Sequence, residues 1–191
     1  MKDKKTFDPA RELFEWAQML VFAFVSFVLV LTFVAGQFEI RQESMTNTLQ
    51  EYDRVIISRL PYTPRRGDVI LFTKYGWRDS SAETGQDSPL AKRVIGLPGD
   101  VIDFDDTSGT LFINGEPQDE PYIKAPMRIW AYELPMPRPV TVEEGCVFVM
   151  GDNRNGSHDS RSTDIGLVDR RSILGRVLLR VAPLKAFGPV T

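Results

Sequence analysis

Residues 16–38 read WAQMLVFAFVSFVLVLTFVAGQF, an uncharged and mostly apolar run. A helix needs about 20 consecutive apolar residues to cross the hydrocarbon core of a bilayer, and this run has that length. It is longer than the roughly 7–15 apolar residues of a cleavable signal peptide. The run therefore predicts an uncleaved membrane anchor. Val34-Ala35-Gly36 forms a weak small-residue cleavage site, so self-cleavage near the anchor stays open as an alternative.

Basic residues near the two ends of the run predict its orientation. Four precede it and two follow within a comparable distance: Lys2, Lys4, Lys5 and Arg11 before, Arg41 and Arg54 after. The excess predicts a single-pass protein of the cell membrane with a cytoplasmic N-terminus at 1–13, a transmembrane helix at 14–38 and an extracytoplasmic domain at 39–191. Ser44, six residues beyond the run, is then expected at the membrane surface.

Length and charge narrow the function classes. The chain has 191 residues, and subtracting the anchor leaves enough for one domain with its own core. A net charge of -3 gives no electrostatic case for binding nucleic acid. Cys146 is the single cysteine, which excludes an internal disulfide. One His and one Cys argue against a Cys/His metal site, and no metal or cofactor is expected.

After the anchor, the chain has the pattern of a β protein. Short runs rich in Val, Ile and Phe recur between turn signals, at 54–58, 68–72, 93–95, 101–104, 110–113, 146–150 and 176–181. Asn114-Gly115 is a strong signal for a two-residue hairpin turn. No stretch after residue 44 has a sustained helical stripe. The sequence predicts a mainly β domain with long loops at 74–90 and 117–138.

Three stretches carry residues suited to catalysis. They are Ser44-Met45, the string KRVIGLPGD at 92–100 and the string GDNRNGSHDSR at 151–161. In this order after an N-terminal anchor, they resemble bacterial type I signal peptidases, the Ser/Lys-dyad endopeptidases that remove signal peptides from exported proteins. The resemblance extends from the anchor to Gly166, and the single anchor and short loops are similar to the Gram-positive form. It implies coiled antiparallel β-sheets of the type shared with self-cleaving repressors.

The resemblance also implies a role for each matched residue. Ser44 attacks the scissile carbonyl with its own backbone N–H as one oxyanion donor, Lys92 accepts the serine proton, and Ser157 hydrogen-bonds the lysine amine. Asp159 and Arg161 correspond to the ion pair that supports the site. The remaining charged pair of this string, Asp152 and Arg154, is expected to hold the loop as capping and turn residues.

The chemistry of Lys92 agrees with this role. A free lysine has a pKa of about 10.4, so a base that works near pH 7–8 needs its pKa lowered by about 3, at a cost of about 4 kcal/mol. Burial is the means, because desolvation disfavours the ammonium form. Leu90 and Ala91 precede Lys92, and Val94 and Ile95 follow it. These apolar neighbours are consistent with a buried lysine. Taken alone, Lys92 reads as a surface lysine and Ser44 as a helix N-cap; the matched strings favour the dyad.

Substrate choice is expected to come from shallow apolar pockets for small side chains, as in an Ala-x-Ala-like site. The matching candidates are Ile40, Met45, Leu49, Leu90 and Ala91. Each reads equally well as ordinary core. Exclusion of bulky side chains, rather than attraction, would set the specificity.

The chain departs from the family pattern at three places. Gln42 stands two residues before the nucleophile, where many members have serine or glycine, so the second oxyanion donor is either its amide or another group. Asn47 replaces a frequent proline, which is expected to alter the turn. The tryptophan-glycine pair that usually follows Arg161 is reduced here to Gly166.

Other classes of protein compete with this interpretation. A Ser/His triad through His158 is disfavoured, because a lone histidine in a polar loop is usually solvated. A self-cleaving repressor-type protease shares the dyad but lacks an anchor. A non-enzymatic, anchored relative is favoured only by Gln42. The expected partners are signal peptides of secretory preproteins, the lipid bilayer and nearby protein-export machinery, with no nucleic acid.

Overall fold

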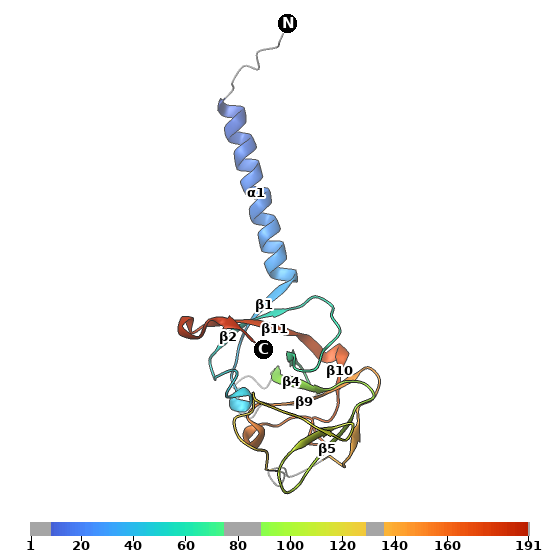
Figure 1. Cartoon of the computed structure of the whole chain (residues 1–191). Coiled ribbons are helices and arrows are strands. Elements are labelled where there is room, and N and C mark those ends of the chain that lie inside the picture. Colours follow the sequence, from blue (N-terminus) through green and yellow to red (C-terminus); the bar gives the residue numbers. More distant parts are fainter. Residues whose placement is uncertain (1–8, 75–88, 129–135, 191) are drawn as a thin grey trace.

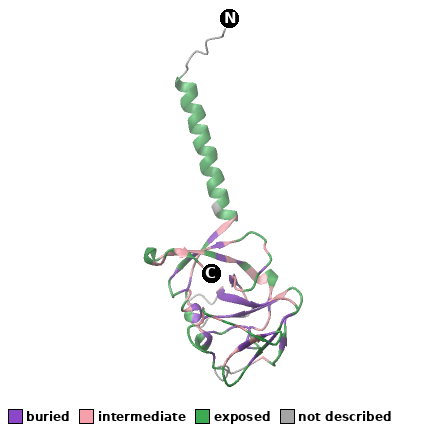
Figure 2. Cartoon of the chain, in the orientation of Figure 1, coloured by how far each residue is buried: buried purple, intermediate pink, exposed green. Residues whose placement is uncertain are grey.

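A single long helix leads into the β domain. In this computed structural model, residues 9–74, 89–128 and 136–190 are described. Helix α1 (Pro9–Phe33) projects away from the domain (Figure 1), and Figure 2 shows it exposed along its described length. Its segment Pro9–Val30 is long and apolar enough to cross a membrane. Residues 1–8, which include Lys2, Lys4 and Lys5, lie outside the described residues.

The helix is displaced from the predicted span of 14–38. It starts at Pro9, because proline suits the first helical position and the polar residues after it continue the helix beyond the apolar run. It ends at Phe33, and strand β1 (Ala35–Glu39) follows at once. The backbone of β1 pairs with β2 (Arg54–Ser58), from Ala35 with Ser58 to Glu39 with Arg54. These residues therefore belong to the sheet.

Arg59 fixes the end of the helix to the domain. Its backbone N–H donates to the Val34 carbonyl at 2.9 Å, and its guanidinium Nη1 donates to the Thr32 carbonyl at 3.3 Å. A cation at a helix C-terminus satisfies free carbonyls and interacts favourably with the helix dipole. The chain therefore leaves the helix in a defined direction.

One antiparallel sheet of eight strands forms most of the domain. Its order is β1-β2-β11-β3-β4-β9-β10, and β12 also pairs with β11. The further bounds are β3 (Val69–Phe72), β4 (Leu90–Gly96), β9 (Cys146–Met150), β10 (Val168–Asp169), β11 (Ile173–Ala182) and β12 (Gly188–Pro189). Neighbouring strands meet in antiparallel register throughout. The predicted antiparallel β fold is confirmed.

A second antiparallel sheet has the order β7-β6-β5-β8. Its strands are β5 (Val101–Phe104), β6 (Leu111–Ile113), β7 (Glu116–Pro117) and β8 (Val140–Thr141). Asn114 and Gly115 join β6 to β7 with φ of 55° and 82°. Positive φ at both positions is what a type I′ turn requires, so the predicted hairpin is confirmed.

The apolar residues form three buried clusters. One lies at the small sheet and includes Ile102 and Phe148, a second includes Met45 and Leu71, and a third includes Phe72 and Val149. In the described part of the chain after β1, each helix is a three-residue 3₁₀ turn: η1 (Glu43–Met45), η3 (Arg154–Gly156), η4 (Arg170–Ser172) and η5 (Leu184–Ala186). Most of the predicted loop 74–90, and residues 129–135 of the loop 117–138, lie outside the described residues.

Candidate active site

The turn η1 presents Ser44 to the interior of the domain. Gln42 precedes the turn in an extended conformation, with φ of -130° and ψ of 149°, and occupies the N-cap position. The N-cap interpretation of Ser44 is therefore wrong: Ser44 is the middle residue of the turn and is 5% exposed. The first N–H groups of a helical turn have no partner within it, and the Ser44 amide is one of them.

Strand β4 brings Lys92 to Ser44. All seven residues of β4 are buried, and Lys92 is only 1% exposed. Its Nζ lies 2.5 Å from Ser44 Oγ. The register of β4 with β9 starts at Arg93, paired with Met150, so Leu90, Ala91 and Lys92 extend beyond the last pair on that side. The two residues matched as nucleophile and base are thus in direct contact, beside the part of β4 that extends past its register with β9.

Burial controls the protonation of Lys92. Desolvation lowers the pKa of Lys92 from 10.5 to about 8. Among nearby charges, Asp159 and Asp152 oppose this change and Arg161 adds to it. Desolvation is the dominant cause, as the apolar neighbours of Lys92 in the sequence predict. A substantial share of the amine is therefore neutral near pH 8.

Ser157, Asp159 and Arg161 form one buried group behind the dyad. Ser157 Oγ donates to Asp159 Oδ2 at 2.6 Å, and Arg161 donates to both carboxylate oxygens at 2.8 Å. The backbone N–H of Gly151 also donates to Asp159, at 2.9 Å. Burial by itself raises the pKa of Asp159, but Arg161 and the hydrogen bonds outweigh it, and the pKa falls below its ordinary value. Asp159 is thus a fixed anion at the centre of the group.

Gly151 joins this group to the nucleophile. A Cβ atom at position 151 would lie 2.2 Å from Ser157 Oγ and 2.4 Å from the Ser44 carbonyl oxygen. The Ser44 carbonyl also accepts from the backbone N–H of Asn153 at 3.0 Å. The loop at 151–157 therefore packs directly against the nucleophile turn, and only glycine fits at the contact.

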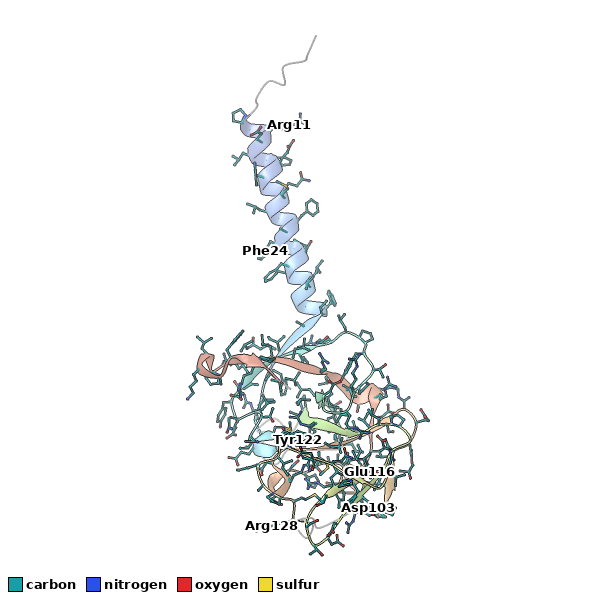
Figure 3. The ribbon with its side chains drawn as sticks, viewed as in Figure 1. Arg11, Phe24, Asp103, Glu116, Tyr122 and Arg128 are labelled. Atoms are coloured by element: carbon teal, nitrogen blue, oxygen red, sulfur yellow. The ribbon has the colours of Figure 1, made fainter. Side chains whose placement is uncertain are left out.

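Two buried ion pairs hold that loop, in place of the capping role predicted for Asp152 and Arg154. Arg93 on β4 donates to both oxygens of Asp152, from Nε at 2.8 Å and from Nη2 at 2.7 Å. Arg154 makes a bidentate pair with Glu120 at 2.5 Å. The Tyr122 ring, labelled in Figure 3, lies 4.2 Å from the Arg93 guanidinium carbon.

Sequence reasoning gave no role to Arg93 or Glu120. Arg93 directly follows the lysine matched as base, and strand alternation turns it to the opposite face. Its place next to Lys92 in the matched string was the one sequence feature that could have indicated a role for Arg93. Glu120 lies in a proline-rich loop, 34 residues before its partner, and no local pattern marks it.

The candidate pocket residues separate into two groups. Ile40, Met45, Leu49 and Ala91 are buried together in one cluster, whereas Leu90 is buried in another with Phe72. Their role in substrate binding stays a prediction.

Two other residues singled out in the sequence lie outside this cluster. Asn47 has a φ of 114°, which proline does not adopt, so the backbone of this turn differs from that of a turn with proline at the same position. His158 is exposed and bonded to Asp164 at 2.5 Å.

The turn that carries Ser44 is set apart from the end of helix α1, and its place at the membrane surface stays a prediction. Figure 1 shows η1 partway along the domain, away from the end that α1 leaves. The helix ends at Phe33, and β1 carries the chain along the sheet before the turn. Because an extended chain advances about 3.3 Å per residue, Ser44 is set well off the helix end. Among the described residues, no group of three or more His, Cys, Asp or Glu side chains is placed to hold a metal ion.

Comparisons with known proteins place this chain in a family. The signal peptidase family, peptidase S26, matches residues 13–182. The chain belongs to this family. It is 36% identical to a probable signal peptidase I-2 of Synechocystis sp., over 98% of this chain and 82% of that protein. It is 31% identical to signal peptidase IB of Staphylococcus aureus, over 93% of each chain.

Among solved structures, the chain is similar to the crystal structure of a signal peptidase I from Enterococcus faecalis V583. The two are 34% identical, with a TM-score of 0.43, and the match covers 61% of this chain and 98% of that one. The segment matched by the signal peptidase family runs from α1 into the end of β11. It therefore includes both the apolar helix and every residue of the site. The helix and the signal peptidase relatives together indicate membrane association.

Proposed function

We propose that the protein is a membrane-bound serine endopeptidase that cleaves N-terminal signal peptides from exported preproteins after small residues. Ser44 is the nucleophile and the neutral amine of Lys92 is the general base. The observation that carries the proposal is the 2.5 Å contact between Lys92 Nζ and Ser44 Oγ, with both side chains buried. A serine hydroxyl becomes a good nucleophile when an adjacent base takes its proton.

Protons pass through Lys92 Nζ in both halves of the proposed reaction. Lys92 Nζ accepts the Ser44 proton as Oγ bonds to the scissile carbonyl carbon. The resulting ammonium returns that proton to the leaving amine as the carbon–nitrogen bond breaks, which leaves an ester on Ser44. Lys92 then takes a proton from water, the hydroxide attacks the ester, and the proton passes to Ser44 Oγ as the acyl group leaves.

Two further features support the proposed chemistry. The buried Asp159–Arg161 pair and the Ser157 hydroxyl bonded to it form a fixed backing for the lysine amine. In our proposal Ser157 accepts a hydrogen bond from that amine and orients it. The Ser44 backbone N–H serves as one oxyanion donor, and Gln42, at the N-cap of the same turn, is the candidate for the second.

The substrate is proposed to bind as an extended strand. The edge of β4 at Leu90–Lys92 extends beyond its last pair with β9, and β1 pairs on one side only, with β2. Edges of this kind bind extended peptides through backbone hydrogen bonds. The buried cluster that includes Ile40, Met45 and Ala91 comes from the same two segments and the turn η1. In our proposal, these residues shape shallow pockets that accept only small side chains, which would give an Ala-x-Ala-like preference.

The anchor sets the proposed location of the reaction. The basic residues before the apolar run favour an N-terminus in the cytoplasm and a β domain on the other side of the membrane. Substrates are then preproteins that emerge from the export machinery of the same membrane, which is the expected neighbour of the enzyme.

The test uses the full-length protein in detergent with a preprotein that carries an Ala-x-Ala site, and maps the cut by mass spectrometry. The wild-type protein is expected to cut after the second alanine. Ser44→Ala and Lys92→Ala are each expected to lose at least about 100-fold in rate. The exposed residues Ser108 and Lys124 provide matched controls, and Ser108→Ala and Lys124→Ala should cut normally. Cutting at the same bond by either dyad variant would contradict the proposal, and an inactive wild-type protein would favour a non-enzymatic relative.

A further inference from the structure

A segment that follows β7 packs against the loop at 151–157. We call residues 120–128 the strap. Asn155 bonds the strap twice: its side-chain amide donates to the Pro126 carbonyl at 2.9 Å, and its side-chain oxygen accepts from the Arg128 backbone N–H at 2.7 Å. The strap is therefore fixed to the loop by hydrogen bonds to its own backbone.

Tyr122 lies in the strap against two buried guanidinium groups. Its ring centroid is 4.2 Å from the guanidinium carbon of Arg93 and 5.9 Å from that of Arg154. The face of an aromatic ring attracts a cation within about 6 Å of its centroid, more strongly where water is excluded. Both arginine side chains are nearly inaccessible to solvent. One ring thus contacts β4, directly after the proposed base, and the loop at 151–157.

The Tyr122 hydroxyl extends this contact to the second buried ion pair. It donates to Glu120 Oε1 at 3.0 Å, and Glu120 accepts both hydrogen bonds of the bidentate pair with Arg154. Burial and then the Glu120 carboxylate raise the pKa of Tyr122 to about 12. The hydroxyl therefore stays protonated and remains a donor at neutral and mildly alkaline pH.

The backbone carbonyl of Tyr122 reaches the nucleophile turn. It accepts from the side-chain amide of Asn47 at 2.9 Å, three residues after Ser44, and Figure 3 labels Tyr122 beside this turn. Asn47 has a φ of 114°. Asparagine tolerates positive φ better than most residues, and proline does not adopt it. The bond to the strap thus depends on the asparagine that stands here in place of the frequent proline.

From these contacts we infer that Tyr122 is a positioning residue, which holds the segments of Ser44, Lys92 and Ser157 in one arrangement without touching the substrate. The inference rests on the proposed function, in which these three side chains act together. Arg93 alternates with Lys92 along β4, so its contact with Tyr122 lies on the face opposite the base. Loss of the ring is expected to displace the reacting groups, and a displacement of about 1 Å can lower a rate about 100-fold.

The first test separates positioning from substrate binding. Tyr122→Leu is expected to lower kcat for preprotein cutting in detergent on the order of tenfold and to change KM less than about twofold, because it moves the reacting groups and spares the binding edges. Tyr122→Phe keeps the ring, and its kcat is expected within about threefold of the wild-type value. Tyr52 is 65% exposed, and Tyr52→Leu is the matched control that should change neither constant.

The second test needs no catalysis, so its failure is distinct from a failure of the proposed function. Carbon NMR of full-length protein labelled at lysine Cε follows the titration of Lys92, whose signal is assigned by its loss in Lys92→Ala. Burial lowers this pKa to about 8, while Asp159 and Asp152 raise it and Arg161 lowers it. A displaced loop admits water to the amine, so the pKa is expected to rise toward 10.5 in Tyr122→Leu and to stay unchanged in Tyr122→Phe.

Asn47→Asp tests the same inference with little risk to the fold, because Asn47 is exposed. It removes the donor to the Tyr122 carbonyl and tolerates the same φ, and it is expected to lower kcat about threefold at unchanged KM. Wild-type kcat and Lys92 pKa in Tyr122→Leu would overturn the inference. So would a higher KM at unchanged kcat, which indicates substrate contact, or equal losses in Tyr122→Phe and Tyr122→Leu. If Tyr122→Leu did not fold, wild-type kcat in Asn47→Asp would overturn it.

Discussion

Position 151 shows how closely the proposed catalytic residues are packed. Lys92 and Ser44 come from a strand and a turn that are 48 residues apart in sequence, yet their side chains meet at 2.5 Å. Ser157 approaches from a third segment. Gly151 lies between the turn that carries Ser44 and the segment that carries Ser157. Because glycine has no side chain, Ser157 Oγ and the Ser44 carbonyl oxygen can both approach this position closely.

Gly151→Ala is therefore expected to inactivate the protein. The new methyl group would lie within 2.4 Å of two atoms of the site, and such overpacking costs about 1–3 kcal/mol and moves the backbone. Rates of preprotein cutting and the free energy of unfolding in detergent measure the effect. Gly188→Ala is the matched control, because a Cβ there meets nothing within 4 Å. Equal activity of the two alanine variants would show that position 151 tolerates a side chain.

At the scale of elements, the buried pair of Arg93 and Asp152 ties strand β4 to the loop that carries Ser157. Both side chains are nearly inaccessible, and Arg93 also donates to the Gly67 carbonyl at 2.8 Å. Removing one member of a buried pair leaves a charge without compensation, whereas replacing both by apolar groups removes the desolvation cost as well. The Arg93–Asp152 pair is therefore expected to fix the position of the loop at 151–157 more than to raise the free energy of unfolding.

Asp152→Ala is expected to lower the free energy of unfolding by about 3–5 kcal/mol, and Arg93→Met/Asp152→Leu by clearly less. Denaturant unfolding of the full-length protein in detergent, followed by near-ultraviolet circular dichroism, measures both. The exposed pair of Arg171 and Asp169 is the control, and Asp169→Ala, which also removes the N-cap of η4, should cost only a small fraction of the loss in Asp152→Ala. If Asp152→Ala behaved like Asp169→Ala, the buried pair would not hold the loop.

Much of the β structure could be predicted from the sequence, and the reasons for the exceptions are local. The run 54–58 coincides with β2, and Asn114-Gly115 forms the expected turn. Strand β1 was missed because its residues continue an apolar run, and neither charge nor length separates a helix from a buried strand there. Two-residue strands such as β7 are defined by their pairing with a neighbouring strand, and no pattern in their own sequence predicts that pairing.

At the scale of the whole molecule, α1, β1 and the β11–β12 hairpin lie at one end, and the catalytic contact lies further along the domain (Figure 1). The contact between Lys92 and Ser44 could be predicted because the strings that carry them are specific to a family. Their supports, Arg93 and Glu120, could not, because long-range ion pairs depend on the folded arrangement. In the proposed function, a substrate held in the same membrane reaches the site through an extended segment, which agrees with the proposed binding along strand edges.

The central claim is that Lys92 acts as a neutral base. Its pKa is lowered by burial to about 8, and only the neutral amine can accept the Ser44 proton. Activity is therefore expected to be half-maximal near pH 8, nearly full above about pH 9, and lost as the pH falls below 8, because the ammonium form then predominates.

The most direct test is the pH dependence of kcat/KM for preprotein cleavage by the full-length wild-type protein. The account predicts a rise with an apparent pKa near 8. A profile that is flat or falling from acidic to alkaline pH would contradict it.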